Sequence, residues 1–221
     1  MAYTEIMTNL RQVFDGIYEN RAWGDGIHSP LSGAGSKPDN AITYVRYVKK
    51  IINDFGIKSV TDFGHGDWLM WGDYRFDGVS YTGIEVSKYA HDLAKRNFGS
   101  VNRNFVLEDV LESKKIVSSE LLISKDVFQH LSIPNIQSLL RIISEGHFRF
   151  LVLCSDVYVR QSTVGKFRYH LSMRTRLKKM LKLENPFFLT LNRRNNSDIF
   201  DGGYRGIDFE ELPFKIGRAH V

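Results

Sequence analysis

Four acidic residues follow four predicted strands of this 221-residue chain and suggest where chemistry could occur. Each ends or follows a short apolar run, and such runs favour buried strands. In an open parallel sheet, ligands bind at the carboxyl ends of the strands. For any one acid, a helix cap or a solvated strand end is the commoner explanation. Four acids at the ends of four successive strands instead indicate a ligand-binding site. They are Asp62, Glu85, Asp109 and Asp126.

The first of these acids belongs to a glycine-containing turn, Val60-Thr-Asp62-Phe-Gly64-His65-Gly66-Asp67-Trp68. Glycine permits sharp bends and a close approach of ligand to backbone. A strand that enters a Gly-x-Gly turn before a helix is typical of nucleotide-binding α/β units, although tight packing alone can also require such a turn. Glu85 follows Gly66 by 19 residues. A carboxylate at about that distance can accept hydrogen bonds from two ribose hydroxyls.

The same turn argues against a nicotinamide dinucleotide, which stays a distant alternative. Leu69 occupies the position of the third glycine of that fingerprint. Asp62 and Asp67 would also repel a pyrophosphate. A loop with acids favours a ligand with positive charge, and S-adenosylmethionine carries a sulfonium and an ammonium group.

The elements that position these residues alternate between strands and helices. Such alternation predicts an α/β fold with a Rossmann-like, doubly wound, mostly parallel sheet and flanking helices. Ser36 can cap the second helix, and Gly56 ends it. Strands are predicted at 57–63, 79–85, 104–107, 121–123, 149–154 and 187–191, and helices at 3–18, 38–55, 67–73, 87–98 and 132–145. A last extended piece is expected near 209–214.

Composition favours a cytoplasmic protein. The sequence shows no basic and apolar leader and no apolar run of about 18 residues, so neither secretion nor a membrane span is expected. The single cysteine, Cys154, lies in an apolar run and is predicted to be a core residue in a reducing compartment. The histidines are scattered without ligand spacing, so no metal site is predicted.

Basic residues concentrate in the segment 157–183. It contains eight Lys or Arg and no acid, whereas the whole chain has a net charge of only +5. Three interpretations remain open: a solvated helix, a lid that binds an anionic substrate, and a nucleic-acid contact surface with interleaved aromatic residues.

The ordered set of motifs resembles class I S-adenosylmethionine-dependent methyltransferases. Within them it is similar to a bacterial and phage subfamily that has Trp-Gly and Ser-Gly-x-Gly-Ser before the first strand. The matching segments are Trp23-Gly24, Ser32-Gly33-Ala34-Gly35-Ser36, Asp62 to Asp67, Lys125-Asp126-Val-Phe-Gln-His130-Leu-Ser132 and, near the end, Asn196 to Phe214 with Gly203 and Arg205. Departures from the subfamily are Phe63-Gly64-His65, Lys125 in place of Arg, and the basic insertion.

The resemblance implies a role for each matching position. Residues 1–56 would supply N-terminal helices and a loop that covers the cofactor, and residues 57–215 would form the methyltransferase core. Glu85 would bind the ribose, and Asp109 with Val110 would bind the adenine. Further cofactor contacts would come from Trp23, Ser32, Gly33, Gly35, Ser36, Asp62, Gly64, His65, Gly66, Asp67, Trp68 and Lys125.

Asp126 and His130 are the predicted catalytic residues. Methyl transfer needs a general base if the acceptor keeps its proton until late. A spacing of four residues would place both side chains on one face of a helical turn. A structural histidine is the equally weighted alternative for His130, and Asp126→Ala is expected to abolish turnover while cofactor binding remains.

The predicted function is methyl transfer to a small, potentially anionic acceptor. Two alternatives remain: a cofactor-binding module without transfer activity, and a nucleic-acid methyltransferase that uses residues 157–183. The last six residues, 216–221, match a translated sequencing adapter, which predicts a non-native tail on a phage or metagenomic reading frame. The sheet could then lack its last strand, and a homodimer could cover the open edge.

Overall fold

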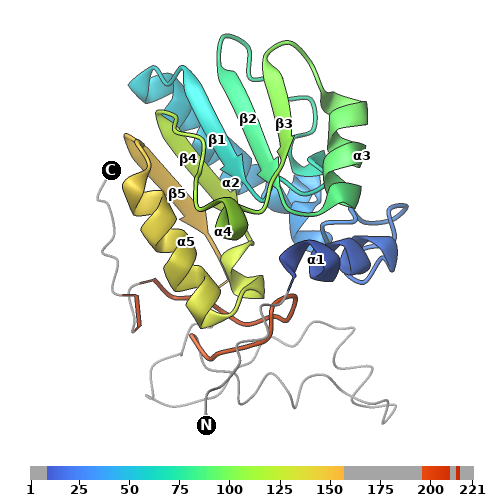
Figure 1. Cartoon of the computed structure of the whole chain (residues 1–221). Coiled ribbons are helices and arrows are strands. Elements are labelled where there is room, and N and C mark those ends of the chain that lie inside the picture. Colours follow the sequence, from blue (N-terminus) through green and yellow to red (C-terminus); the bar gives the residue numbers. More distant parts are fainter. Residues whose placement is uncertain (1–8, 157–195, 210–212, 215–221) are drawn as a thin grey trace, which may run out of the picture.

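Five parallel strands in the order β3-β2-β1-β4-β5 form the centre of the protein (Figure 1). The computed structural model describes residues 9–156, 196–209 and 213–214. All five strands lie within two or three residues of their predicted positions, so the predicted parallel α/β sheet is confirmed. Their bounds are β1 Ser59–Phe63, β2 Ser80–Glu85, β3 Arg103–Leu107, β4 Leu121–Lys125 and β5 Phe150–Cys154.

The strand order reverses beside β1. This strand pairs with β2 on one side and with β4 on the other, so that Val60 lies between Tyr81 and Leu121. The chain therefore leaves β1 toward one edge of the sheet and, after β3, crosses back to build the other. A crevice opens at the carboxyl ends of the strands where such a reversal occurs.

The helices begin and end at local sequence signals. Ser87 caps α3, since its side chain accepts a hydrogen bond from the backbone N–H of Ala90. Gly56 ends α2 in the left-handed conformation, at φ 63°. The bounds are α1 Leu10–Glu19, α2 Pro38–Phe55, α3 Lys88–Phe98, α4 Val110–Ser113 and α5 Ile133–Glu145, with 3₁₀ helices η1 Ala34–Ser36, η2 Leu69–Trp71 and η3 Phe128–His130.

Three local predictions were wrong. Ser36 does not cap α2, because it belongs to η1 and Lys37 precedes the helix without a side-chain cap. Pro38 begins that helix, and the fixed φ of proline suits the first helical position. The helix expected over 67–73 is only the 3₁₀ turn η2. The described part of 209–214 consists of turn residues instead of an extended piece.

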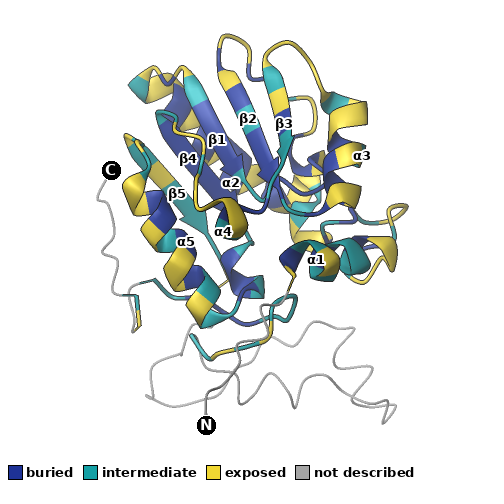
Figure 2. Cartoon of the chain, in the orientation of Figure 1, coloured by how far each residue is buried: buried dark blue, intermediate teal, exposed yellow. Residues whose placement is uncertain are grey.

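Two apolar clusters cover the two faces of the sheet (Figure 2). Residues of β4 alternate between them, since Leu121 and Ile123 join one cluster and Leu122 joins the other. Helix α2 and η2 pack on the first face, while α1 and α5 supply the second. Because both faces are covered, the strands are apolar almost throughout, as is usual for parallel sheets.

Several predictions fall on residues outside the described part of the chain. These are the basic segment 157–183, the strand at 187–191, the tail at 216–221 and the start of the first helix. Cys154 is half-buried and packs against the apolar cluster on the α2 face of the sheet, so its assignment to the core is confirmed in part. Within the described ranges, no helix has the length and apolar composition that a bilayer crossing requires.

Candidate active site

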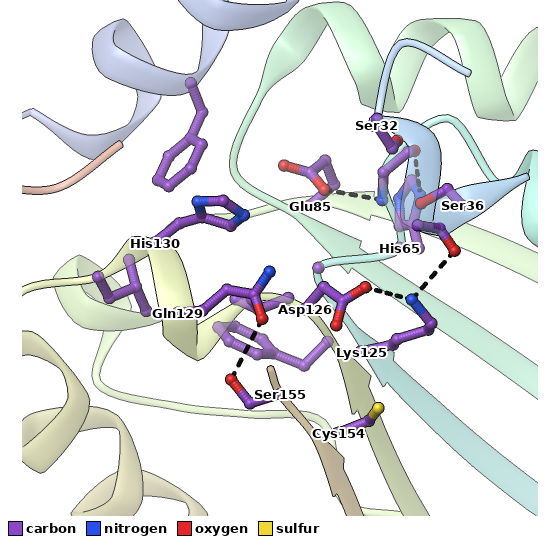
Figure 3. Close-up of a pocket in the computed structure, with 18 of the residues that line it drawn as sticks. Ser32, Ser36, His65, Glu85, Lys125, Asp126, Gln129, His130, Cys154 and Ser155 are labelled. Atoms are coloured by element: carbon purple, nitrogen blue, oxygen red, sulfur yellow. Dashed lines mark hydrogen bonds and ion pairs between the residues drawn. The ribbon is translucent and has the colours of Figure 1, made fainter. Parts of the chain in front are cut away.

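A cavity of about 1060 Å³ lies at the carboxyl ends of β1, β2, β4 and β5 (Figure 3). The chain segments that follow these strands form its floor, and α1 with the loop before α2 forms its cover. Of the predicted site residues, those that line the cavity are Trp23, Ser32, Gly33, Gly35, Ser36, Gly64, His65, Gly66, Glu85, Asp109, Val110, Lys125, Asp126 and His130.

The glycine turn after β1 needs both of its glycines. Gly64 and Gly66 have φ values of 74° and 59°, a region that other residues rarely adopt. A Cβ atom on Gly64 would lie 2.3 Å from Cγ2 of Val127, and one on Gly66 would lie 2.3 Å from Oγ of Ser32. The turn is therefore packed against both the loop before α2 and the segment after β4.

Glu85 ends β2 with its carboxylate between two backbone donors. Oε2 accepts from the N–H of Gly66 at 3.0 Å, and Oε1 accepts from the N–H of Ser87 at 2.9 Å. Burial raises the pKa of Glu85 to about 7, because the charged form loses solvation that the two hydrogen bonds only partly replace. Each oxygen keeps a further lone pair for a ligand.

The loop before α2 is attached to the glycine turn by reciprocal hydrogen bonds. The N–H of Asp67 donates to Oγ of Ser32 at 2.8 Å, and the N–H of Ser32 donates to Oδ2 of Asp67 at 3.2 Å. Asp67 is buried and does not line the cavity. Its position supports a role in holding the cover, not in contacting a ligand.

Asp62 and Trp68 also lie outside the cavity lining. Oδ2 of Asp62 accepts from Nε1 of Trp71 at 3.2 Å and from the hydroxyl of Tyr81 at 2.7 Å, on the α2 face of the sheet. Burial raises the pKa of Asp62 to about 6. Trp68 is 1% exposed and packs in the apolar cluster on the same face. These positions do not support the predicted contacts of Asp62 and Trp68 with a cofactor.

His65 occupies the centre of the glycine turn and is buried. Its Nδ1 donates to the carbonyl of Gly66 at 2.8 Å, and its ring meets Phe105 edge-on. Burial lowers its pKa to about 3, so the imidazole is neutral. The residue lines the cavity mainly as an apolar surface.

Asp109 follows β3 and caps the short helix α4. Its Oδ1 accepts from the backbone N–H groups of Leu111 and Glu112 at 2.9 and 3.4 Å. The capping oxygen fixes the orientation of the side chain, which leaves Oδ2 for a ligand. Val110 lies beside it as an apolar wall of the cavity.

Lys125 and Asp126 form an ion pair at the end of β4. Nζ of Lys125 also donates to the carbonyl of Gly35 at 3.2 Å, which brings the covering loop against β4. A Cβ on Gly35 would lie 2.9 Å from Oδ2 of Asp126, so a larger residue there would have to displace this carboxylate. Asp126 has a φ of 60° and lies before η3, so it does not share a helical turn with His130 as predicted.

His130 presents an unprotonated nitrogen to the cavity. Its Nδ1 lies 2.7 Å from the carbonyl of Gly203, and a carbonyl only accepts, so Nδ1 carries the hydrogen. Burial lowers the pKa of His130, which keeps the ring neutral and leaves Nε2 unprotonated as an acceptor. Nε2 has no partner among the described residues and is not sealed from solvent. Trp23 packs on the ring, with centroids 4.4 Å apart.

A segment more than 70 residues away fixes the turn that carries His130. The carbonyls of Phe128, Gln129 and His130 accept from Nη1 of Arg205, the N–H of Arg205 and the N–H of Gly202, at 3.0, 3.1 and 2.8 Å. Arg205 is fully buried, and its Nε and Nη2 lack partners among the described residues. We call residues 202–205 the clamp.

Three residues that sequence reasoning did not assign to the site have positions in it. Gln129 and Tyr204 line the cavity, and Arg205 belongs to the clamp. The motif similarity included Arg205 and the block around Gln129, but nothing in the sequence connected the two segments. The described residues contain no group of three or more His, Cys, Asp or Glu that could hold a metal ion.

Comparison with known proteins identifies the architecture. No protein-family model matches the sequence, and the search of curated proteins gives no match. Among solved structures, magnesium protoporphyrin IX methyltransferase (ChlM) from Synechocystis PCC 6803 with bound SAM has a TM-score of 0.53 at 16% identity, covering 73% of this chain and 82% of that chain. The chain has the fold of this methyltransferase.

Two further structures share the fold. ChlM from the same organism with bound SAH has a TM-score of 0.52 at 15% identity, covering 89% of this chain and 95% of that chain. The DhpI-SAM-HEP complex has a TM-score of 0.51 at 11% identity, covering 73% of this chain and 70% of that chain. The Rossmann-like, methyltransferase-type fold predicted from the sequence is therefore confirmed.

Proposed function

We propose that this protein transfers a methyl group from S-adenosylmethionine to a small-molecule acceptor. The observation that carries the proposal is the cavity at the strand ends, with the carboxylate of Glu85 held at the end of β2 beside the glycine turn. Solved structures with the same fold contain SAM or SAH. Ligands of open parallel sheets bind at this edge.

The charges that line the cavity support a cationic cofactor. Lys125 is the single Lys or Arg in the described lining, and Asp126 already neutralises it. The acids outnumber it, since Glu85, Glu108, Asp109, Asp126 and Asp156 line the same space. Such a lining suits a sulfonium and an ammonium group and opposes a pyrophosphate, because like charges at short range destabilise binding.

The residues around the glycine turn would hold the cofactor. Glu85 would accept hydrogen bonds from the ribose hydroxyls, and Asp109 with Val110 would contact the adenine. Gly64 and Gly66 would allow the methionine part to lie against the backbone. We call Gly64 to Gly66, Glu85, Asp109 and Val110 the cofactor half of the cavity.

The opposite side of the cavity supplies the groups for an acceptor. We call Lys125, Asp126, Gln129 and His130 the acceptor half. Ligand pockets commonly measure roughly 300–1,000 Å³. At about 1060 Å³, this cavity has room for two small molecules side by side.

His130 would act as the general base. The cofactor supplies a methyl group that is already activated, so the protein mainly orients the acceptor and excludes water. Nε2 of neutral His130 would remove the proton of the acceptor, while the carbonyl of Gly203 stabilises the charge that develops on Nδ1–H. Asp126 is paired with Lys125 and would hold Lys125 and the covering loop in place.

The anionic character expected of the acceptor depends on the basic segment 157–183, which lies outside the described residues. The described lining offers no unpaired cation for an anionic group. Methylation of a nucleic acid likewise depends on that segment. Both stay alternatives that the experiment can separate.

Calorimetric titration of S-adenosylhomocysteine, with NAD⁺ as the control ligand, tests cofactor choice. We expect binding of the first and none of the second, and the reverse result would contradict the proposal. Transfer of a tritiated methyl group from S-adenosylmethionine to a cell extract then tests activity. Label in the small-molecule fraction supports the proposal. Label in nucleic acid supports the alternative, and binding without any labelled product supports a binding module.

A further inference from the structure

The side-chain amide of Gln129 has one orientation. Its Oε1 accepts from the backbone N–H of Asp156 at 2.8 Å and lies 3.4 Å from Oγ of Ser155. A backbone N–H only donates, so the atom that faces it must be the oxygen. The NH₂ group therefore points the other way. With 4% of Gln129 exposed and η3 held by the clamp, this orientation is fixed.

The NH₂ group of Gln129 opens into the cavity without a partner. Gln129 lines the cavity, and no described residue accepts from its nitrogen. The nitrogen is not among the sealed, unpartnered atoms of the described residues, so a ligand can reach it. In Figure 3 the amide nitrogen points away from Ser155, to the side where His130 and Asp126 lie. A donor turned toward an open cavity can bind an oxygen of a ligand.

The next residue contributes the complementary group. Nε2 of His130 is an acceptor that faces the same cavity, on the same 3₁₀ turn. Both groups line the same cavity from one turn, so a ligand that carries the opposite pair of groups side by side would complement them. That pair is a hydroxyl, which donates to His130, beside an oxygen, which accepts from Gln129.

We propose that Gln129 and His130 select a neutral acceptor in which the hydroxyl to be methylated lies next to a second, hydrogen-bond-accepting oxygen. The proposal rests on the proposed function, because it names the acceptor of the same site. The absence of an unpaired cation from the described lining favours a neutral over an anionic second group. In the reaction the hydroxyl oxygen forms a bond to the methyl carbon, the carbon–sulfur bond breaks with its electrons remaining on sulfur, and the proton moves to Nε2.

The test uses 2-methoxyphenol and 4-methoxyphenol as probes with the full-length protein. The two isomers are neutral and have the same groups, but only the first has its hydroxyl beside the second oxygen. Dissociation constants are measured by calorimetry in the presence of saturating S-adenosylhomocysteine. We expect the protein to bind the first isomer about tenfold more tightly, in line with one well-placed hydrogen bond.

Gln129→Glu is the matched variant. It keeps an oxygen for the N–H of Asp156 and replaces the NH₂ group with an acceptor. The hydrogen bond from Asp156 is therefore retained, while the donor toward the cavity is lost. We expect the preference between isomers to disappear and the affinity for S-adenosylhomocysteine to stay unchanged. Gln129→Met, which adds no charge, should also lose the preference.

The inference would be overturned by equal binding of the two isomers, by binding of neither, or by an unchanged preference in Gln129→Glu. The variant could also lose affinity for S-adenosylhomocysteine and keep its preference between the isomers. That result would place the Gln129 amide at the cofactor and would overturn the inference. If the unmodified protein does not bind S-adenosylhomocysteine at all, the proposed function fails first. Failure of the isomer test alone leaves that function intact.

Discussion

The two halves of the cavity differ in how their polar groups are held. In the cofactor half, residues close in sequence satisfy much of each side chain, as when Glu85 accepts from Ser87 and Asp109 accepts from Leu111. In the acceptor half, Gln129 and His130 keep open groups and depend on the clamp, more than 70 residues away. The cofactor half is held by contacts within and just after neighbouring strands, whereas the acceptor half is assembled from segments far apart in the sequence.

In the proposed function, this difference would separate cofactor binding from methyl transfer. Local hydrogen bonds form with each strand and its turn, so the cofactor half needs only the pairing of β1, β2 and β3. The acceptor half requires the chain to return from beyond residue 196 before η3 has its geometry. Substitutions in the cofactor half should therefore change affinity for the cofactor, and substitutions in the acceptor half should change turnover.

Replacement of the base should have the largest effect. We expect His130→Ala to lower the rate of methyl transfer by about 10²- to 10⁴-fold, the usual contribution of a general base. Affinity for S-adenosylhomocysteine should stay within about twofold, because the ring does not belong to the cofactor half. Single-turnover transfer from labelled S-adenosylmethionine measures the first quantity, and calorimetry measures the second.

The pH dependence of the same rate provides an independent check. The pKa of His130 is lowered by burial, so the rate of the unmodified protein should fall only at a pH below the ordinary histidine value. This fall should be absent in His130→Ala. His147→Ala, an exposed histidine before β5 at the other end of the sheet, is the matched control and should leave the rate unchanged.

Loss of the carboxylate in the cofactor half should have the next largest effect. Glu85→Gln should weaken binding of S-adenosylmethionine about tenfold to a hundredfold, because hydrogen bonds to a charged acceptor are worth more than those to a neutral one. Glu145→Gln, at an exposed glutamate of α5 that does not line the cavity, is the control and should have little effect.

Cofactor affinity should also increase as pH rises. Burial raises the pKa of Glu85 to about 7, so the empty protein holds a proton there below pH 7 that cofactor binding must displace. We expect affinity to fall as pH drops from about 8 to 6 in the unmodified protein and to be flatter in Glu85→Gln. An equally steep fall in the variant would assign the dependence to another group.

The sequence could predict the cofactor half because its signals are local. Apolar runs located the strands, Gly64 and Gly66 marked the turn, and Glu85 occurred at the end of a strand. The sequence prediction assigned Asp62 to the cofactor site, although the alternation of side chains along β1 indicates that Asp62 faces the α2 side of the sheet. Side chains alternate along a strand, so Asp62 lies on the same face as Val60, which joins the cluster beneath α2. Phe63 points to the opposite face and joins the other cluster.

The acceptor half could be predicted only in part. His130 and Asp126 follow a strand and could be nominated on that basis, but the ring tautomer depends on the carbonyl of Gly203. The open amide of Gln129 depends in turn on the N–H of Asp156, which follows the next strand. No periodicity connects segments so far apart, since tertiary packing alone brings them together.

Weakening the clamp should have a moderate effect on turnover. Arg205→Lys keeps the positive charge but lacks the planar donor that reaches the carbonyl of Phe128. We expect a rate about tenfold lower, since small displacements of a base are costly, with S-adenosylhomocysteine affinity unchanged. The pH at which the rate falls should also shift, because the clamp sets the surroundings of His130. Arg141→Lys, on the exposed part of α5, is the control. An unchanged pH profile would contradict a positioning role.

The smallest effect should come from Asp62, the buried carboxylate behind the glycine turn. Burial raises its pKa from 3.8 to about 6, and Oδ1 has no partner among the described residues. A raised pKa means that the folded state holds the proton more tightly than the unfolded state. Stability is therefore lost as pH rises from about 4 through 6, by about 3 kcal/mol at roughly 1.4 kcal/mol per pKa unit.

Asp62→Asn should remove that cost, because its oxygen can still accept from Trp71 and Tyr81. Its new N–H groups would be buried and unpaired, which offsets roughly 1–3 kcal/mol of the gain. We expect the variant to be about 1 kcal/mol more stable at pH 7.5 and less stable than the unmodified protein at pH 4, as measured by urea unfolding. Asp73→Asn, at an exposed aspartate nearby, should show no such reversal. Affinity for S-adenosylhomocysteine should not change, and a loss as large as that of Glu85→Gln would place Asp62 in the cofactor half after all.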